Sequence, residues 1–299
     1  MRYAESDDMA EARIRIAKPD IVKVFDRRGV TVLKKADIET ILQENREFWR
    51  LRRTMTAEDF LEFLLHETSL RKVALNFPHR KVVRYVWGEA DLYTLLMSID
   101  EKCYLSHYTA IQVHGLTGQV PKTIYVNKEQ PAKPAPSQLL AQDRIDEAFK
   151  RPTRLSQNFV NYDNRRIYLL SGKQTGNLGV IETEGPEHTM VRVTDVERTL
   201  IDITVRPEYA GGVFEVLRAY RLARGRVSVN KLVATLRKLD YLYPYHQAIG
   251  FYLERAGVYK ENSIGLLRRS EFKYDFYLMH QIRDKAYSDK WRLFFPKGL

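Results

Sequence analysis

A short motif toward the end of the chain, Glu271-Phe272-Lys273, places an acid and an amine two residues apart. Side chains two residues apart on a strand share one face, so Asp275 would join this pair. Such an arrangement is typical of restriction-type nucleases, in which the residues hold a divalent metal ion and polarise water. However, no convincing upstream aspartate stands on a partner strand, and the apolar alternation from Phe272 to Leu278 explains a half-buried strand. We therefore predict a structural strand, with a metal-dependent nuclease as the alternative.

Other residue types that bind metals or phosphates do not complete a site. His107 and His114 lie seven residues apart without a third ligand beside them, so helix capping and packing are preferred. Residues 171–179, SGKQTGNLG, lack the glycine and Gly-Lys-Ser/Thr order of a phosphate-binding loop, which favours a flexible hairpin loop. The single cysteine, Cys103, excludes an internal disulfide and a cysteine-rich zinc site. We therefore predict no metal, no cofactor and no enzymatic activity.

Local clusters of basic side chains carry the clearest functional signal. The net charge of +11 is uneven, because residues 1–100 sum to +1, 101–200 to +2 and 201–299 to +8. An N-terminal nucleic-acid site must therefore depend on local clusters. Residues 70–87, LRKVALNFPHRKVVRYVW, read as a β-hairpin in which the expected phosphate contacts are Arg71, Lys72, Arg80, Lys81 and Arg84. The alternative is a solvated hairpin edge, which basic residues protect from pairing.

The helix that would enter the major groove begins at Thr56 and carries four acids and no lysine or arginine, so phosphates would repel it. Arginine pairs well with guanine edges. Base reading is therefore assigned to the arginines just before that helix: Arg46, Arg50, Arg52 and Arg53. The alternative is that the acidic helix is structural and the domain docks on protein.

A second run of basic residues lies in the last third of the chain. It is either an ordinary solvated face or a second nucleic-acid surface. Its members are Arg218, Arg221, Arg224, Arg226, Lys231, Arg237 and Lys238.

The N-terminal elements that must position these residues are three helices and the hairpin. Residues 1–17 are polar and of mixed charge, which predicts a loosely held tail or an oligomer arm. Pro19 suits the first turn of a helix that stops at Gly29, a second helix spans about 36–44, and a Thr56/Asp59 capping box opens the third. With the hairpin tip at 77–79, residues 18–90 are predicted to form a winged helix-turn-helix.

Residues 91–299 are predicted to form one further domain. A short helix at 91–98 leads to a strand, a helix opened by Ser106, a turn and a strand over 104–126, and the proline-containing stretch 128–137 reads as an exposed connection. Extended runs at 158–162, 165–170, 180–183 and 190–193 predict a small sheet. A second capping box, Thr194 with Glu197, precedes helices at 213–223, 229–239 and 246–256. The expected fold class is α+β, with a mixed α/β C-terminal domain that contains a small sheet and several helices.

The apolar runs are far shorter than a membrane-spanning helix requires, and the first residues lack the apolar core of a signal peptide. The expected location is therefore the cytoplasm, without a membrane partner.

Two segments resemble one known family. Residues 106–126, SHYTAIQVHGLTGQVPKTIYV, are similar to the segment that follows the DNA-binding domain in the AbiEi family. This family comprises antitoxins and autoregulatory repressors of type IV toxin–antitoxin, or abortive-infection, systems. Residues 192–212, RVTDVERTLIDITVRPEYAGG, resemble the same family. The resemblance covers most of the chain from about residue 70 to 257.

This resemblance implies a winged-helix domain that represses its own operon at repeated double-stranded operator sites, with a homodimer on DNA as one arrangement. It also implies a C-terminal domain that counteracts a nucleotidyltransferase-like toxin, for which a stable complex is not required. No residue set in the sequence accounts for the antitoxin activity. A stand-alone winged-helix regulator of a defence locus is the alternative, ahead of the nuclease.

Overall fold

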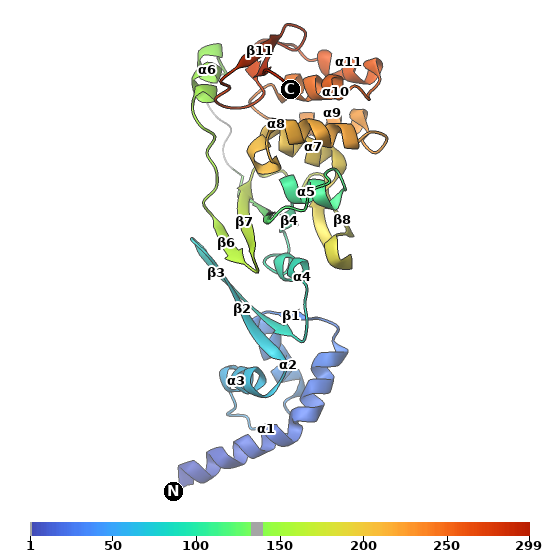
Figure 1. Cartoon of the computed structure of the whole chain (residues 1–299). Coiled ribbons are helices and arrows are strands. Elements are labelled where there is room, and N and C mark those ends of the chain that lie inside the picture. Colours follow the sequence, from blue (N-terminus) through green and yellow to red (C-terminus); the bar gives the residue numbers. More distant parts are fainter. Residues whose placement is uncertain (1, 133–139) are drawn as a thin grey trace. The chain divides into compact units, whose positions relative to one another are not determined.

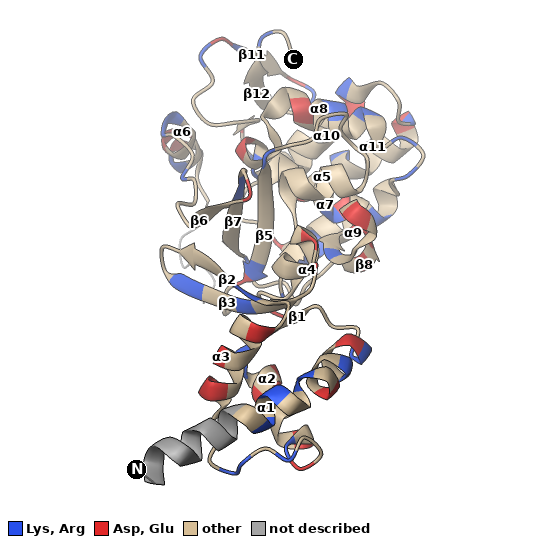
Figure 2. Ribbon diagram, turned by 60° about the horizontal axis from the view of Figure 1, so that its bottom comes forward, with Lys and Arg blue, Asp and Glu red and all other residues tan. Residues whose placement is uncertain are grey.

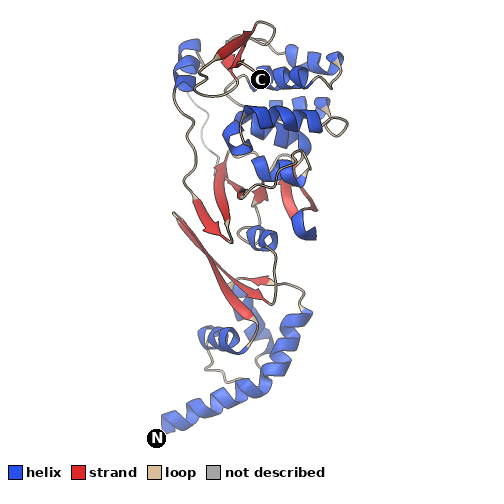
Figure 3. Cartoon of the chain, in the orientation of Figure 1, coloured by secondary structure: helices blue, strands red, loops and turns tan. Residues whose placement is uncertain are grey.

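The computed structural model describes the backbone of residues 2–132 and 140–299, and the side chains in these ranges from residue 12 onward. Helices and strands occur in both of its compact units, which span Met1–Ile99 and Asp100–Leu299 (Figure 1, Figure 3). The fold is therefore mixed α and β, consistent with the expected α+β class.

The first unit combines helices with a small antiparallel sheet. Strand β3 lies in the middle, with β1 and β2 as its neighbours. The hairpin is fully paired, from Leu70↔Trp87 to Phe77↔Arg80, with its turn at residues 78–79 as predicted. The elements in chain order are α1 (Arg2–Arg27), β1 (Val32–Leu33), α2 (Lys35–Asn45), α3 (Ala57–Glu67), β2 (Leu70–Phe77), β3 (Arg80–Trp87) and α4 (Leu92–Met97).

The predicted helix start at Pro19 is wrong, because α1 already begins at Arg2 and continues through Pro19. Ile14 and Ala17 are buried and continue the apolar face of Ile21. Their spacing of three and four residues matches the helical repeat, which the polar composition of residues 1–17 obscured. A proline inside a helix lacks the amide for one backbone bond and bends the helix, and α1 is visibly bent (Figure 1).

The predicted start of the third helix is confirmed in detail. The amide of Asp59 donates to Thr56 Oγ1 at 3.1 Å, and the amide of Thr56 donates to Asp59 Oδ2 at 3.0 Å. This reciprocal capping box satisfies amides that have no partner inside the helix. Trp49 stacks on Phe60 with ring centroids 5.6 Å apart, which packs the α2–α3 loop onto the core.

The first unit ends after Ile99, nine residues later than the predicted boundary at residue 90. Arg84 on β3 causes this difference. Its guanidinium donates to the carbonyl oxygens of Ser98 at 2.6 Å and Ile99 at 2.9 Å. The end of α4 is therefore tied to the hairpin, and the short helix belongs to the first unit.

The second unit is built on a six-stranded mixed sheet in the order β6-β7-β5-β4-β9-β8. The β5·β7 and β4·β9 pairs are parallel, and the other neighbours are antiparallel. The expected extended runs all appear in it. Its strands are β4 (Tyr104–Leu105), β5 (Thr123–Glu129), β6 (Phe159–Tyr162), β7 (Arg165–Gly172), β8 (Val180–Glu184) and β9 (Met190–Thr194).

The helices of the second unit include all those predicted after residue 194. A core of aliphatic and tyrosine side chains joins α7, α8 and α10, including Leu200, Val216, Tyr220 and Tyr252. The expected exposed connection at 128–137 falls partly outside the described residues. The helices are α5 (His107–Val113), α6 (Gln142–Lys150), α7 (Val196–Val205), α8 (Val213–Leu222), α9 (Val229–Leu239), α10 (Tyr245–Ala256) and α11 (Glu261–Arg268), with 3₁₀ turns at Pro186–His188 and Pro207–Ala210.

Two predicted helix caps are wrong. The N-cap of α7 is Asp195 and not Thr194, because Thr194 is still paired in β9 while Asp195 Oδ1 accepts from the Arg198 amide at 2.8 Å. Ser106 does not cap α5 with its side chain, and its hydroxyl lies 2.9 Å from His107 Nδ1 instead. In both cases the strand immediately before the helix constrains the residue expected to cap it.

The predicted strand from residue 271 shrinks to β10 (Phe276–Tyr277), which forms a second, three-stranded sheet with β11 (Lys285–Ser288) and β12 (Leu293–Pro296). Gly250 on α10 makes room for this sheet. A Cβ at that position would lie 2.0 Å from the fully buried ring of Trp291. Among the described helices, none is long and apolar enough to cross a membrane.

Candidate functional site

Four basic side chains on the hairpin β2–β3 are exposed: Arg71, Lys72, Arg80 and Lys81. Figure 2 shows basic segments along these strands. Arg71 donates to Gly88 O at 2.9 Å, and Arg80 makes a long bond to Ile99 O at 3.4 Å. Lys72 and Lys81 form no ion pair with any residue that the structure describes. Arg71 lies 3.5 Å from the carboxylate of Glu89, so Lys72, Arg80 and Lys81 are the hairpin charges that no described carboxylate neutralises.

Arg84, the fifth predicted phosphate contact, has a different role. It is 8% exposed, and its Nε donates to Ser98 O at 3.1 Å while Nη1 donates to Val83 O at 2.7 Å. A buried guanidinium is costly unless its donors are satisfied, and here backbone carbonyls satisfy them. Arg84 is therefore a structural anchor, and the prediction that it contacts phosphates is withdrawn.

The four arginines before α3 also separate into two roles. The guanidinium of Arg46 donates to Arg52 O at 2.5 Å and to Met55 O at 3.0 Å, which folds the loop between α2 and α3. Arg46 is thus occupied within the protein, contrary to its predicted contact with bases. Arg50 and Arg53 are exposed, and Arg52 is half-buried. These three remain together on one loop.

The acids of α3 are largely engaged inside the first unit. Lys35 forms an ion pair with Glu58, Lys18 lies 3.1 Å from Glu67, and Asp59 caps the helix. The ion-pair partners lower the pKa of both glutamates, so these remain charged. Glu62 is exposed beside a groove of about 670 Å³ between α1 and α3, lined also by Arg52, Met55 and Phe63. The outer face of α3 is therefore acidic and partly apolar.

The second basic run divides between two helices and the loop that joins them. Arg226 donates to His114 O, and Lys231 lies 2.9 Å from carboxylate oxygens of both Asp195 and Glu197. These two cations bind their own unit. Arg218, Arg221, Arg224, Arg237 and Lys238 are exposed, and of these five Arg218 alone has a carboxylate within 4 Å in the part of the chain that the structure describes, Glu215 at 3.9 Å. The sequence pattern alone did not distinguish these groups.

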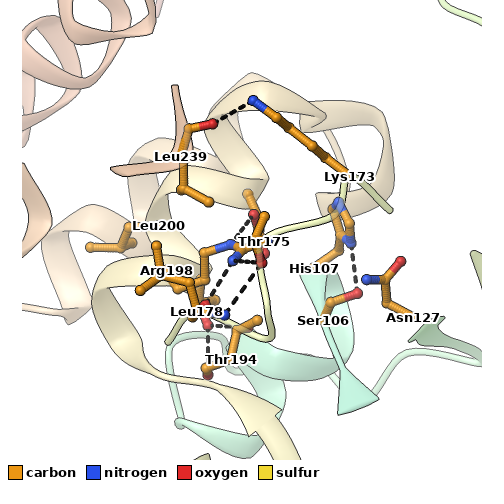
Figure 4. Close-up of polar contacts among 12 residues, drawn as sticks. Ser106, His107, Asn127, Lys173, Thr175, Leu178, Thr194, Arg198, Leu200 and Leu239 are labelled. Atoms are coloured by element: carbon orange, nitrogen blue, oxygen red, sulfur yellow. Dashed lines mark hydrogen bonds and ion pairs between the residues drawn. The ribbon is translucent and has the colours of Figure 1, made fainter. Parts of the chain in front are cut away.

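A buried polar network that the sequence analysis missed lies around Arg198 on α7 (Figure 4). Arg198 Nε donates to Asp202 Oδ1 at 2.8 Å, and the two side chains are 5% and 8% exposed. Arg198 Nη1 donates to Leu178 O at 2.7 Å. Burial opposes the positive charge, but the carboxylate of Asp202 raises the pKa of Arg198 overall. The spacing of four residues between Arg198 and Asp202 on a helix was the sequence feature that could have predicted this pair.

The same network holds residues 173–178 and corrects the prediction of a flexible hairpin loop there. Strands β7 and β8 are not neighbours in the sheet, so the segment is a crossover. Glu129 Oε2 accepts from the amides of Thr175 at 2.8 Å and Asn177 at 3.3 Å. Lys173 donates to Leu239 O at 2.6 Å at the end of α9 (Figure 4). The glycine-containing segment is therefore anchored to the strand end by a carboxylate of the chain itself.

His107 begins α5 with a left-handed backbone, φ 52°, which is unusual for a residue that is not glycine. Its ring lies 5.3 Å from that of Tyr209 and 6.1 Å from that of Tyr125. Burial, with the positive charges of Arg198 and Arg206, lowers the pKa of His107 to about 3. His114 bonds to Thr194 O at 2.6 Å through Nε2. Both histidines therefore take packing or hydrogen-bonding roles.

The nuclease-like residues are paired with one another or with neighbours. Lys273 Nζ lies 3.2 Å from Glu271 Oε2, in an exposed segment outside the strands. Asp275 Oδ1 accepts from Arg292 Nε at 2.9 Å and from the Tyr287 hydroxyl at 2.7 Å. Within the described ranges there is no group of three His, Cys, Asp or Glu side chains placed to hold a metal ion.

No family model and no curated protein matches the chain. Among solved structures, the chain is similar to the crystal structure of RV2827C protein from Mycobacterium tuberculosis, with 15% sequence identity and a TM-score of 0.58. The match covers 92% of this chain and 89% of the other. At this identity the likeness concerns the fold alone, and it extends over both compact units.

Proposed function

We propose that the chain is a DNA-binding transcriptional repressor that also serves as the antitoxin of a type IV toxin–antitoxin system. In this proposal the first unit is a winged helix-turn-helix that binds the operator of its own operon. The second unit counteracts a nucleotidyltransferase-like toxin without requiring a stable complex. The cytoplasm is the proposed location, and no catalytic residue is assigned.

The exposed basic hairpin carries the DNA-binding half of the proposal. The first unit has the element order α1-β1-α2-α3-β2-β3 and a sheet in the order β1-β3-β2, which suits a winged helix. Lys72 and Lys81 share one face of the hairpin and are then the wing residues that contact phosphates, whereas Arg71 and Arg80 lie on its other face. The acidic outer face of α3 favours base contacts from Arg50, Arg52 and Arg53 on the preceding loop.

The antitoxin half depends on the resemblance of two segments, 106–126 and 192–212, which the fold brings together. Strand β4 pairs with β9 through Leu105↔Val193, and α5 contacts α7. The bond from His114 to Thr194 joins the segments directly. The two segments that resemble the family therefore belong to one packed core of the second unit.

A salt titration of DNA binding tests whether the first unit recognises the operator. Lys81→Ala should weaken binding to operator and random DNA alike and reduce the salt slope by about one unit, because one phosphate contact is lost. Arg52→Ala should cost roughly 1 to 3 kcal/mol on the operator and relax specificity. Lys23→Ala is the matched control, since Lys23 pairs with Asp20 at 3.0 Å on α1.

If both variants bind the operator like the wild type, the first unit does not recognise the operator. The exposed residues of the second basic run, Arg218, Arg221, Arg224, Arg237 and Lys238, then become the better candidates.

Two observations separate this proposal from its alternatives. A neighbouring nucleotidyltransferase gene would favour the antitoxin, and an isolated gene would favour a stand-alone regulator. Magnesium- or manganese-dependent cleavage of nucleic acid that is lost on replacing Glu271 and Lys273 by alanine would establish the nuclease. We expect no such cleavage, since those two side chains pair with each other in an exposed segment.

A further inference from the structure

The solvent-facing side of α8 is unusual in composition. Four residues on one helical stripe are exposed: Phe214, Arg218, Arg221 and Leu222. Phe214 is 57% exposed and Leu222 is 44% exposed. The opposite side of α8 packs into the core through Val213, Val216 and Leu217. The helix is therefore anchored without its exposed apolar residues.

A loop before β5 extends the same surface. Thr117 Oγ1 donates to Glu215 Oε1 at 2.6 Å, and a Cβ on Gly118 would lie 3.0 Å from Arg218 Nη2. The loop therefore lies against α8. Its residue Val120 is 82% exposed, the largest exposed fraction among the large hydrophobic side chains that the structure describes.

The charge of this surface is one-sided. Arg221 has no carboxylate partner among the described residues, and Arg218 has only Glu215 at 3.9 Å. Glu215 is 14% exposed at its side chain and already accepts from Thr117, so it offers little negative charge to solvent. Two exposed arginines therefore lie between large apolar side chains without a compensating acid on the stripe.

Aromatic residues and arginine are enriched at protein interfaces, and arginine binds carboxylates through two parallel hydrogen bonds. Nucleic acid fits this surface less well, because Phe214 is its one aromatic ring and the other apolar side chains, Val120 and Leu222, cannot stack on bases. We propose that the α8 surface, defined as Val120, Phe214, Arg218, Arg221 and Leu222, docks a partner protein through a segment rich in acidic and large apolar side chains. This surface lies apart in sequence from the proposed DNA-contacting hairpin, and the inference goes beyond the proposed function.

Binding of a labelled amphipathic peptide built from Glu-Leu-Leu-Glu repeats to the full-length chain, followed by fluorescence anisotropy, tests the proposal. We expect saturable binding that weakens about tenfold or more in Phe214→Ser and in Arg218→Glu combined with Arg221→Glu, as for residues central to an interface. Peptides with lysine in place of glutamate, or serine in place of leucine, should bind at least tenfold more weakly. Leu242→Ser is the matched control, because Leu242 is 50% exposed outside this surface.

Three outcomes would overturn the proposal. In the first outcome, the acidic peptide fails to bind or binds the wild type and all variants equally. A single-stranded oligonucleotide binds instead and loses affinity in the same variants, which assigns the surface to nucleic acid. Alternatively, the wild type forms a dimer in sedimentation experiments that Phe214→Ser dissociates, which assigns the surface to a second copy. Circular dichroism of each variant verifies folding, which these exposed substitutions should leave intact.

Discussion

Arg84 on β3 and Ser98 after α4 are joined by a 2.6 Å hydrogen bond from the guanidinium to the carbonyl oxygen, and this contact closes the first unit. It explains why the unit includes α4, and it makes the boundary of the first unit testable.

A fragment of residues 1–99 should fold and bind DNA, whereas a fragment of residues 1–90 should be less stable, because it lacks α4 and the carbonyl acceptors that Ser98 and Ile99 offer to Arg84. A hydrogen bond from a charged group contributes about 1.5 to 3 kcal/mol. Urea unfolding of both fragments measures this difference. The combination of Arg84→Met with the shorter fragment is the control, since it removes the charge and should recover part of the loss. Equal stability of the two original fragments would contradict the anchoring role.

The buried pair of Arg198 and Asp202 should respond asymmetrically to mutation. Asp202→Asn leaves the guanidinium charged and without its counter-ion, so we expect a loss of about 3 to 5 kcal/mol in the free energy of unfolding. Changing both residues to apolar ones of similar volume should cost much less. Chemical denaturation of the full chain gives both values, and Arg151→Met, which removes an exposed pair with Glu147, is the control. A double variant as unstable as Asp202→Asn would show that the charge is not the cause.

We expect His107 to make the stability of the folded chain fall as the solution becomes acidic. Its pKa is about 3 in the folded chain and near 6.5 when unfolded, so only the unfolded state takes up a proton between these values. The stability that neutral His107 contributes is therefore complete above about pH 6.5 and is lost as pH falls toward 3. Asparagine tolerates the left-handed backbone and does not titrate there, so His107→Asn should lose less stability than the wild type between pH 7 and 5. Thermal unfolding at both pH values decides this, and parallel losses in the two proteins would exclude the effect.

Gly250 should tolerate no side chain. In Gly250→Ala the new methyl would lie 2.0 Å from Trp291, so the indole or the helix must move at a cost of about 1 to 3 kcal/mol or more. Tryptophan fluorescence should report the displaced ring, and denaturation should report the loss. Gly265→Ala on α11 is the matched control, because its new Cβ would have no contact closer than 3.8 Å, and alanine favours a helix. Unchanged fluorescence and stability in Gly250→Ala would show that α10 and the ring of Trp291 can move apart at no cost.

Local patterns in the sequence were enough to place most elements. The alternating hairpin strands of residues 70–87, the capping box of Thr56 with Asp59, and the helices after residue 213 are all confirmed. These features depend on neighbours in the chain, namely the two-residue period of strands, the helical repeat and the side chains that satisfy terminal amides. The basic character of the hairpin and of the last third likewise follows from composition.

The tertiary structure decided which polar residues are available to a partner. Arg84 and Lys81 lie on one strand and both were predicted to contact phosphates, yet only Lys81 is exposed. Arg84 is buried because Ser98, fourteen residues later and just after α4, supplies a carbonyl acceptor, and Lys231 is paired because Asp195 and Glu197 lie beside it in the fold. Whether a charge faces solvent or a partner inside the protein depends on groups distant in the chain, and no local pattern contains that information.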